Sequence, residues 1–331
     1  MNRIIAEIGS VHDGSLGNAL RLIDAAAEAG ADAVKFQTHL AEAESLADAP
    51  SPGYFSDEPR IAYFKRSGFT AEQWKKLARQ AQAAKVVFLS SPFSIEAVDL
   101  LEDVGVSAYK IPSGEVTNVP LLERVAATRK PALLSSGMSD WSELDRAVAI
   151  LKPACELTVL QCSSAYPCPP EQVGLNVLAE MRGRYGTAVG LSDHTLGIAA
   201  AVAAAALGAT VIEKHFTFSR LMYGSDAKHS MEPEDFKRFC EALREVWRMQ
   251  TSPVDKDDVS PYTEMKRIFQ KSVVAARALR AGTVLTRDML AFKKPGDGIP
   301  ASQYRTLLGS KLRRDVPADS KFSADNLEQG S

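Results

Sequence analysis

Eight short apolar runs alternate with helix-like stretches along the first three quarters of the chain, and this alternation constrains the fold more than any other feature. The runs are Arg3 to Ala6, Ala33 to Phe36, Val86 to Leu89, Ala108 to Ile111, Ala132 to Leu134, Leu157 to Leu160, Thr187 to Leu191 and Thr210 to Ile212. Segments with helical periodicity, such as Ala19 to Glu28 and Ile198 to Leu207, lie between them. Eight buried strands with helical crossovers are the count of a (β/α)8 barrel of about 250 residues. We therefore predict an α/β fold with a (β/α)8 TIM barrel over residues 1–250, against an open doubly wound sheet as the competitor.

Nearly every run is followed by polar or charged side chains at the point where its strand would end. These clusters are Glu7, Lys35 with Gln37, Ser90 with Ser91, Lys110 with Ser113, Ser135 with Ser136, Gln161 to Ser164, Ser192 to His194, and Glu213 to His215. The C-terminal strand ends of a barrel meet at one face, where barrel enzymes carry their catalytic groups. We expect these side chains to surround one pocket.

Two histidines, His194 and His215, end consecutive predicted strands and would face the same cavity. Imidazole suits divalent transition metal ions, and a site with two histidines leaves coordination positions open for substrate oxygens. The sequence therefore indicates a metal site. A pair of hydrogen-bonded core histidines is the alternative interpretation.

Lys35 and Lys110 end the second and fourth predicted strands and would lie among several hydroxyl groups. These hydroxyls belong to Ser91, Ser113, Ser135, Ser164 and Ser192. Convergent lysines and hydroxyls suit a small dianion or trianion such as a phosphate or carboxylate compound, because desolvating such an anion is costly. A structural ion pair is the alternative for either lysine taken alone.

Three carboxylates, those of Glu7, Glu115 and Asp226, fall at or near the same rim. They suit proton transfer or the binding of sugar hydroxyls, although a carboxylate beside a lysine can simply neutralise it. His12 lies in the first strand-to-helix loop, where it either binds substrate or caps the helix. His229 lies in a loop and is a weaker metal ligand candidate.

Residues 251–266 are polar and contain proline, which is typical of a linker. Residues 267–331 combine a β-like segment, Ser272 to Ala275, with turn signals at Ala281-Gly282 and Pro295 to Gly298. We predict a small β-rich domain that is marginally stable by itself.

The overall charge excludes some functions. The chain has 39 Lys and Arg against 41 Asp and Glu and a net charge of −2, which offers no footprint for nucleic acid or an anionic membrane. No signal peptide or membrane span is visible, and the four cysteines have no metal-binding spacing. We expect a cytoplasmic protein with reduced thiols.

Several ordered motifs resemble one family. They are Ala6-Glu7-Ile8-Gly9 followed by His12 and Gly14, Ala29 to Thr38, Tyr109 to Glu115, Ser135 to Met138, Tyr166-Pro167, Gly190 to Thr195, and Glu213 to Phe216. Together they resemble the N-acetylneuraminate (sialic acid) synthase family, with its legionaminate, pseudaminate and spore-coat-polysaccharide relatives. Arg277 to Gly309 is similar to the antifreeze-like SAF domain that this family carries after its barrel. The resemblance thus covers nearly the whole chain.

The resemblance implies a condensation of phosphoenolpyruvate with an N-acyl hexosamine such as N-acetylmannosamine, with release of phosphate. It implies a divalent metal, Mn2+ with Mg2+ or Co2+ as the other candidates, held by His194 and His215. Phosphoenolpyruvate would be held by Lys35, Lys110, Ser91, Ser113, Ser135, Ser164 and Ser192. The sugar would lie near Glu7, Gln37, Tyr166 and Asp226, and Glu115 would take part in proton movement. The predicted catalytic residues are Glu7, Lys35, Lys110, Glu115 and Asp226.

The relatives form domain-swapped homodimers in which the SAF domain of one subunit covers the barrel mouth of the other. Lys294 stands where some relatives bring an Arg to the sugar, and a lysine cannot reproduce a bidentate Arg contact. Val11 and Ser163-Ser164 also depart from the common pattern, so the choice among N-acyl and di-N-acyl hexosamines stays open. The alternatives are a phosphoenolpyruvate-condensing enzyme for a sugar phosphate, and a non-catalytic protein that binds carbohydrate or acts through its SAF-like domain.

Overall fold

The structure is a computed structural model that describes residues 2–50 and 58–328. Within these residues, eight parallel strands close into a barrel in sequence order, and β8 pairs with β1. The strands are β1 (Arg3–Gly9), β2 (Ala33–Thr38), β3 (Val87–Pro92), β4 (Tyr109–Ile111), β5 (Ala132–Ser135), β6 (Leu157–Cys162), β7 (Ala188–Asp193) and β8 (Val211–His215). Each predicted apolar run overlaps one of these strands. The predicted barrel is confirmed, and the open sheet is excluded.

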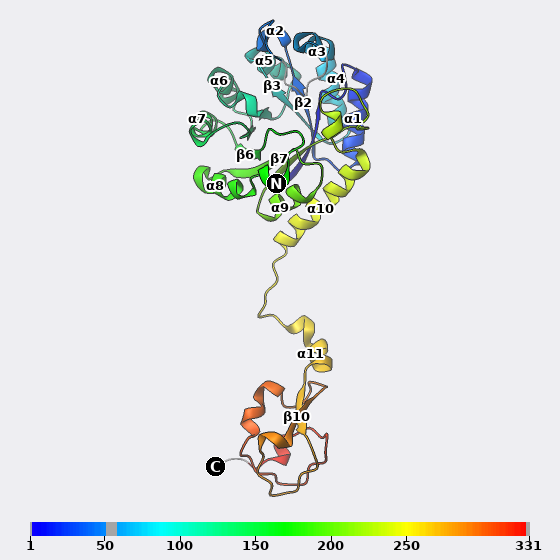
Figure 1. The fold of residues 1–331 in the computed structure, drawn as a ribbon, viewed down its shortest axis with the longest axis vertical. Coiled ribbons are helices and arrows are strands. Elements are labelled where there is room, and N and C mark those ends of the chain that lie inside the picture. The colour runs from blue at the N-terminus through cyan, green and yellow to red at the C-terminus, as the bar shows by residue number, and fades with distance from the viewer. Residues whose placement is uncertain (1, 51–57, 329–331) are drawn as a thin grey trace. The chain divides into compact units, whose positions relative to one another are not determined.

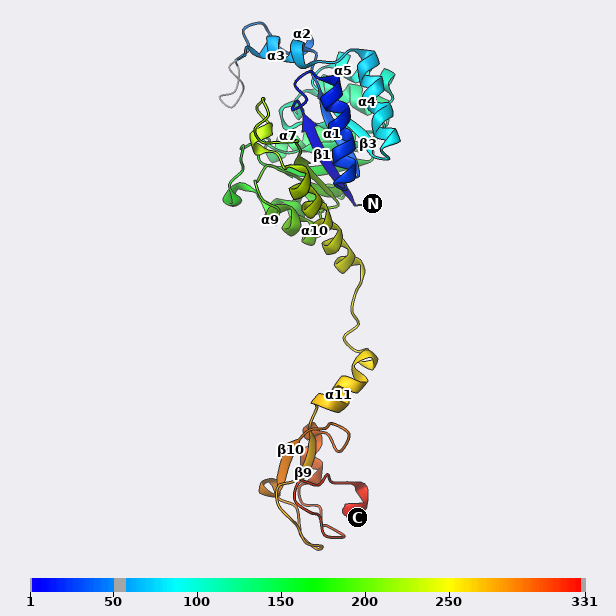
Figure 2. The same ribbon diagram turned by 90° about the vertical axis from the view of Figure 1, so that its right-hand side faces the viewer.

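Helices form a ring outside the strands (Figure 1). They are α1 (Leu16–Glu28), α4 (Ala71–Ala83), α5 (Ile95–Val104), α6 (Val119–Thr128), α7 (Trp141–Leu151), α8 (Leu175–Tyr185), α9 (Ala199–Ala206) and α10 (Pro233–Thr251). Two further helices, α2 (Ala41–Glu44) and α3 (Arg60–Ser67), belong to the long connection between β2 and β3. They lie at the end of the barrel opposite the N-terminus, which is the end toward which β1 runs (Figure 2).

Local sequence explains where the outer helices begin and which face they bury. The side chain of Ser15 accepts a hydrogen bond from the first turn of α1, and Thr70 with Gln73 forms a capping box at the start of α4. In α1 the buried residues are Ala19, Leu22, Ile23 and Ala26. Their spacing of three and four residues gives one apolar stripe, which packs on the barrel.

The interior of the barrel is filled near the strand starts by an apolar cluster. Its buried members are Ile5, Ala33, Leu89, Leu160 and Val211. Side chains alternate between the two faces of a strand, so the residue two positions later points to the same side. Those following residues are Glu7, Lys35, Ser91, Cys162 and Glu213. The alternation therefore places this apolar cluster, here called the plug, near the strand starts. The polar side chains form the next layer, at the C-terminal strand ends.

Gly190 on β7 makes room for this plug. A Cβ atom at Gly190 would lie 2.5 Å from the Cδ2 atom of Leu160 and 2.2 Å from the carbonyl oxygen of Val211. Any larger residue would collide with the neighbouring strand.

The chain divides into two compact units, Met1–Ser252 and Pro253–Ser331. The second contains α11 (Thr263–Phe269) and an antiparallel pair, β9 (Ser272–Ala275) with β10 (Leu290–Lys293). Its core includes Val273, Ala275, Leu285, Leu312 and Phe322. Among residues 2–50 and 58–328, the short 3₁₀ helices are Ser113–Glu115, Pro170–Gln172, Ala227–His229, Ser260–Tyr262, Arg287–Met289, Ala301–Leu307 and Ala324–Asn326.

Residues 251–266, predicted as a linker, include the end of α10, one 3₁₀ turn and the start of α11. The predicted domain boundaries at 250 and 267 stay predictions.

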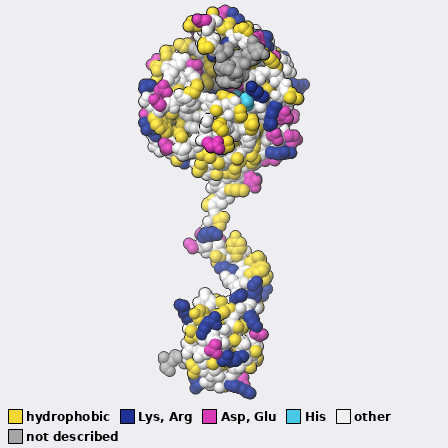
Figure 3. Space-filling view, in the orientation of Figure 1, with side chains coloured by type: hydrophobic (Ala, Val, Ile, Leu, Met, Phe, Trp, Pro, Cys, Tyr) yellow, Lys and Arg dark blue, Asp and Glu magenta, His cyan; other side chains and the backbone are white. Residues whose placement is uncertain are grey.

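Positive and negative side chains are interspersed on the viewed face of the barrel unit (Figure 3). Within the described residues, the four cysteines are buried and form no disulfide. None of the described helices has the length and apolar character needed to cross a bilayer.

Candidate active site

A buried carboxylate, Glu213 on β8, lies between the two predicted anion-binding lysines. Its Oε1 atom is 3.6 Å from Nζ of Lys35 and 3.8 Å from Nζ of Lys110. Lys35 also lies 3.0 Å from Oε1 of Glu7. All four side chains are at most 5% exposed. The lysines from β2 and β4 thus flank the same carboxylate, and the strand-end pattern predicts that they lie close together.

The two carboxylates of this cluster differ in their affinity for protons. Burial raises the pKa of Glu213, but attraction to Lys110 and Lys35 outweighs it and brings the pKa to about 2. Burial raises the pKa of Glu7 above its ordinary value, and the nearby Glu213 adds to this effect. Glu213 therefore stays ionised as a counter-ion, whereas Glu7 is the carboxylate better able to hold a proton.

The lysines also differ. Burial works against the charge of Lys35, but Glu213 and Glu7 outweigh it and raise its pKa. Burial lowers the pKa of Lys110. The cluster contains two cations and one firmly ionised carboxylate, so it retains capacity for an incoming anion.

Hydroxyl groups from three strands contact the charged cluster. Lys35 donates to Ser91 Oγ at 3.2 Å, and Lys110 donates to Ser135 Oγ at 2.7 Å. The hydroxyl of Ser192 donates to Oε1 of Glu213 at 3.0 Å. Ser91 and Ser135 accept from lysines here, so their own hydrogens can turn toward a bound anion.

Two more predicted hydroxyls meet at the bare backbone of Gly137. A Cβ atom on Gly137 would lie 2.5 Å from Ser164 Oγ, 2.7 Å from Ser113 Oγ and 3.2 Å from Cys162 Sγ. The absence of a side chain at Gly137 lets these two hydroxyls approach the backbone. The Ser-Ser-Gly-Met motif after β5 thus contributes a small polar cradle.

The two histidine rings lie side by side, with His194 directly after β7 and His215 at the end of β8. Their centroids are 5.4 Å apart, and the ring of Tyr166 is 4.1 Å from His194 and 6.0 Å from His215. Nδ1 of His194 is hydrogen-bonded to the carbonyl oxygen of Ser163 at 2.8 Å, which fixes the ring. The predicted pair is therefore together in space.

The donor atoms fit a divalent metal ion with open coordination positions. Burial lowers the pKa of His215 to about 4, so this imidazole is neutral near pH 7, and its Nδ1 is buried without a hydrogen-bond partner. In residues 2–50 and 58–328 no group of three or more His, Cys, Asp or Glu side chains could hold a metal ion by itself. His194 and His215 would supply two ligands, and water or substrate oxygens the others.

The side chains of Asp226 and Gln37 approach Gly9, the last residue of β1. A Cβ atom on Gly9, which has a φ of +54°, would lie 2.6 Å from Asp226 Oδ2 and 3.4 Å from Gln37 Nε2. Gln37 donates from Nε2 to Oε1 of Glu7 at 2.7 Å. These groups adjoin the lysine cluster through Glu7.

Three residues singled out from the sequence lie outside these contacts. Glu115, in the 3₁₀ helix after β4, accepts a hydrogen bond from Asn118 at 2.7 Å, and burial raises its pKa. Lys294 belongs to the second unit, where its Nζ lies 4.8 Å from the ring centroid of Phe269. Its predicted contact with the sugar stays a prediction.

The third, His12, is buried against aromatic rings. Its centroid lies 4.6 Å from that of Phe69, and its Nδ1 accepts from the N–H of Gly14 at 3.1 Å. It closes the loop before α1, while Ser15 caps the helix. The substrate-binding interpretation gains no support from these contacts.

Glu213 has no assigned role in the sequence-based site, although it lies in a predicted strand-end cluster. The two-residue spacing between Glu213 and His215 would have indicated that Glu213 faces the site, because residues two positions apart lie on the same face of a strand. The same two-residue spacing places Cys162 on the inner face of β6, because Leu160 points into the barrel.

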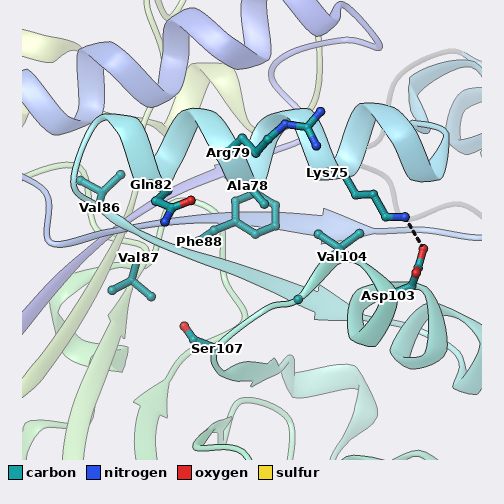
Figure 4. Close-up of a pocket in the computed structure, with 11 residues that line it drawn as sticks. Lys75, Ala78, Arg79, Gln82, Val86, Val87, Phe88, Asp103, Val104 and Ser107 are labelled. Atoms are coloured by element: carbon teal, nitrogen blue, oxygen red, sulfur yellow. Dashed lines mark ion pairs between the residues drawn. The ribbon is translucent and has the colours of Figure 1, made fainter.

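Two clefts lie away from the charged cluster. One of about 520 Å³ lies between α4 and α5 beside the start of β3, where Lys75 and Asp103 form an ion pair at 2.9 Å (Figure 4). Another, mostly apolar and of about 640 Å³, lies between the loops after β6 and β7. Neither is lined by the charged cluster.

Known proteins with similar sequences cover almost the full chain. The NeuB family pattern matches residues 22–255, and the SAF domain pattern matches residues 270–328. The N,N'-diacetyllegionaminic acid synthase of Campylobacter jejuni subsp. jejuni serotype O:2 is 35% identical over 325 residues, covering 96% of this chain and 97% of that protein. The human N-acetylneuraminate-9-phosphate synthase is 36% identical over 327 residues, covering 96% of this chain and 90% of that protein.

The solved structures agree. The N-acetylneuraminic acid (sialic acid) synthetase of Leptospira borgpetersenii serovar Hardjo-bovis, in complex with citrate, superposes with a TM-score of 0.71 at 30% identity. The superposition covers 80% of this chain and 90% of the synthetase chain. Family pattern, curated relatives and fold all agree with the resemblance seen in the motifs. The chain therefore belongs to the NeuB family and carries a SAF domain in its second unit.

Proposed function

We propose that this protein is a nonulosonate synthase that condenses phosphoenolpyruvate with an N-acylated hexosamine and releases inorganic phosphate. The observation that carries the proposal is the shared burial of Lys35, Lys110 and Glu213 at the same end of the barrel as the neighbouring His194 and His215. In this proposal the C-terminal strand ends offer cations for an anionic substrate and imidazoles for a metal ion. The names of the relatives, which are synthases of legionaminic, pseudaminic and neuraminic acids, support the same reaction class.

Lys35 and Lys110 bind phosphoenolpyruvate in this proposal. The lysines compensate its charge, and hydroxyls replace its hydration. The hydroxyls belong to Ser91, Ser113, Ser135, Ser164 and Ser192. Glu213 stays ionised between the lysines and keeps them fixed when the site is empty.

His194 and His215 would hold the divalent ion, for which we propose Mn2+, with Mg2+ or Co2+ as alternatives. When bound, such an ion supplies Lewis-acid polarisation of a substrate oxygen. The chain's part is to keep the His215 imidazole neutral and the His194 ring oriented: burial lowers the pKa of His215, and the carbonyl of Ser163 fixes the ring of His194.

In the proposed reaction, the methylene carbon of phosphoenolpyruvate forms a bond to the aldehyde carbon of the open-chain sugar. Water adds to the former enol carbon, and the bond from that carbon to the phosphate oxygen breaks. Burial raises the pKa of Glu115 above its ordinary value, and we assign proton transfer to this carboxyl group. Glu7, Gln37, Tyr166 and Asp226 line the side of the site that we assign to the sugar.

We further propose that the protein is cytoplasmic and works as a homodimer, as the resemblance implies. The presence of Lys294 in place of an Arg favours a sugar-binding mode different from that of a strict N-acetylmannosamine enzyme.

The test is to incubate the protein with Mn2+, phosphoenolpyruvate and a panel of N-acyl and di-N-acyl hexosamines, and to measure phosphate release and product mass. We expect one phosphate per molecule of nine-carbon acid, with one sugar preferred. His215→Ala is expected to abolish metal-dependent turnover and to leave the circular dichroism spectrum unchanged. Metal binding without turnover of any sugar would favour the non-catalytic alternative.

A further inference from the structure

A hydrogen-bonded chain of side chains leads from the connection after β2 into the sugar side of the site. Nε2 of His39 lies 3.0 Å from Oε1 of Gln37, and Nε2 of Gln37 donates to Oε1 of Glu7 at 2.7 Å. Glu7 in turn contacts Lys35 at 3.0 Å. His39 is two residues beyond Gln37, and no role in the site has been assigned to it.

The ring of His39 is held on both faces and at both nitrogens. It is stacked between Phe64, at 3.7 Å and 13°, and Phe93, at 4.0 Å and 20°. Its Nδ1 is 2.9 Å from Oε1 of Glu44 in α2, and the two side chains are 8% and 3% exposed. The ring can therefore neither tilt nor rotate without breaking several contacts.

These partners select one orientation of the Gln37 amide. Oε1 of Glu7 lies 3.0 Å from the ammonium of Lys35 and so accepts hydrogen bonds whether or not the other oxygen carries a proton. It therefore requires the amide nitrogen of Gln37, and the amide oxygen then faces His39. The ring nitrogen that faces Gln37 must carry a hydrogen. Nδ1 and Glu44 then need one further hydrogen between them, because two hydrogen-bond acceptors would repel each other.

The fixed amide has a second N–H that Glu7 does not use. Gln37 Nε2 lies 3.4 Å, and Asp226 Oδ2 2.6 Å, from the position that a Cβ on Gly9 would occupy. The space above Gly9 is therefore bordered by an amide nitrogen and a carboxylate oxygen. A rotated amide would present oxygen there, next to the carboxylate of Asp226, and would repel a substrate oxygen.

We propose that His39 is a positioning residue for the sugar substrate: together with Glu44 it holds the Gln37 amide with its nitrogen toward Glu7 and the sugar. This inference rests on the proposed function. It concerns only the sugar, because the contacts of Lys35 and Lys110 with their serines do not pass through His39. The competing view is that His39 merely attaches the segment that carries α2 and α3 to the barrel.

Two substitutions at position 39 separate these views. An Asn amide reaches roughly the place of Nδ1, so His39→Asn keeps a donor for Glu44 and loses the one for Gln37. A Gln amide reaches roughly the place of Nε2, so His39→Gln keeps the donor for Gln37. Phe64→Leu weakens the stack without touching any of these hydrogen bonds and is the structural control.

The measurement is steady-state kinetics with both substrates varied, together with thermal unfolding of each variant. We expect His39→Asn to raise KM for the sugar about tenfold, the size of one lost hydrogen bond, with KM for phosphoenolpyruvate changed less than about twofold. His39→Gln and Phe64→Leu should keep both KM values within about twofold of the wild type. In a double-mutant cycle, adding His39→Asn to Gln37→Ala should cause little further loss, because the two residues act as a unit.

Wild-type turnover is measured first and tests the proposed function by itself; its absence would overturn this inference as well. Given turnover, additive effects in the cycle, or equal changes in both KM values, would show that His39 only supports the fold. If His39→Asn does not fold, His39→Gln decides the question, since a tenfold rise of its sugar KM contradicts the inference.

Discussion

Nζ of Lys214 lies 2.8 Å from Oδ2 of Asp193, and both side chains are only 1% exposed. The two residues are partners in the register of β7 and β8, and each directly precedes one of the histidines, His194 and His215. Lys214 also donates to the carbonyl oxygen of Thr195 in the loop after β7. This ion pair therefore joins the two strand ends from which the imidazoles project.

Lys214→Met should destabilise the barrel strongly, because it leaves the carboxylate of Asp193 buried without a counter-ion. We expect a loss of about 3–5 kcal/mol in the free energy of unfolding, measured by urea denaturation. The control is Lys65→Met, which breaks an exposed pair with Glu42 in the same unit and should cost under about 1 kcal/mol. Equal losses in the two variants would show that the buried pair has no special role.

Lys110→Met should lower kcat/KM by about a thousandfold, since it removes one of the two cations available to phosphoenolpyruvate. Lys76→Met, at an exposed position on α4, is the control and should behave like the wild type. Steady-state phosphate release gives both values. A variant with near-normal efficiency would remove Lys110 from the anion site.

Gly137→Ala should raise KM for phosphoenolpyruvate at least tenfold. The added methyl group would lie 2.5 Å from Ser164 Oγ and 2.7 Å from Ser113 Oγ, so it fills the cradle that we assign to the anion. Gly183→Ala is a matched substitution on α8, where a Cβ has nothing within 4 Å. If both variants bind phosphoenolpyruvate as tightly as the wild type, this cradle is not part of the anion site.

The alternation of side chains along each strand explains why most of the site could be predicted from the sequence. Lys35 and Glu213 each follow a plug residue by two positions. An apolar residue that points into the barrel therefore also indicates that the polar residue two positions later points inward. For this reason Lys35, Lys110 and the two histidines are found on the inner face of the strand ends, as expected.

Groups in loops could not be predicted in the same way, because their position depends on tertiary packing. His12 lies in the expected loop, and its ring packs on Phe69, a contact that the sequence pattern does not indicate. The ring of His39 packs between Phe64 and Phe93, which lie far from it in the sequence and have no periodic relation to it. Pairwise contacts of this kind leave no pattern in a single sequence.

Acid should reduce the contribution of Glu213 to stability. The pKa of this carboxyl is about 2 in the folded protein, against an ordinary value of 4.5, because Lys110 and Lys35 overcome the effect of burial. A lowered folded-state pKa adds stability above about pH 4.5, and this stability is lost as the pH falls toward about 2. The difference in unfolding free energy between the wild type and Glu213→Gln should therefore shrink between about pH 6 and about pH 3. Urea denaturation at several pH values measures it, and a constant difference would contradict the assigned charge state.

The most direct test of the account is a crystal structure of the protein with Mn2+ and phosphoenolpyruvate, with the metal located by anomalous scattering. The account predicts one manganese peak between the rings of His194 and His215, and phosphoenolpyruvate in the same cavity with its charged groups at Lys35 and Lys110. A metal bound away from the two histidines, or phosphoenolpyruvate bound outside the ring of strand ends, would contradict it.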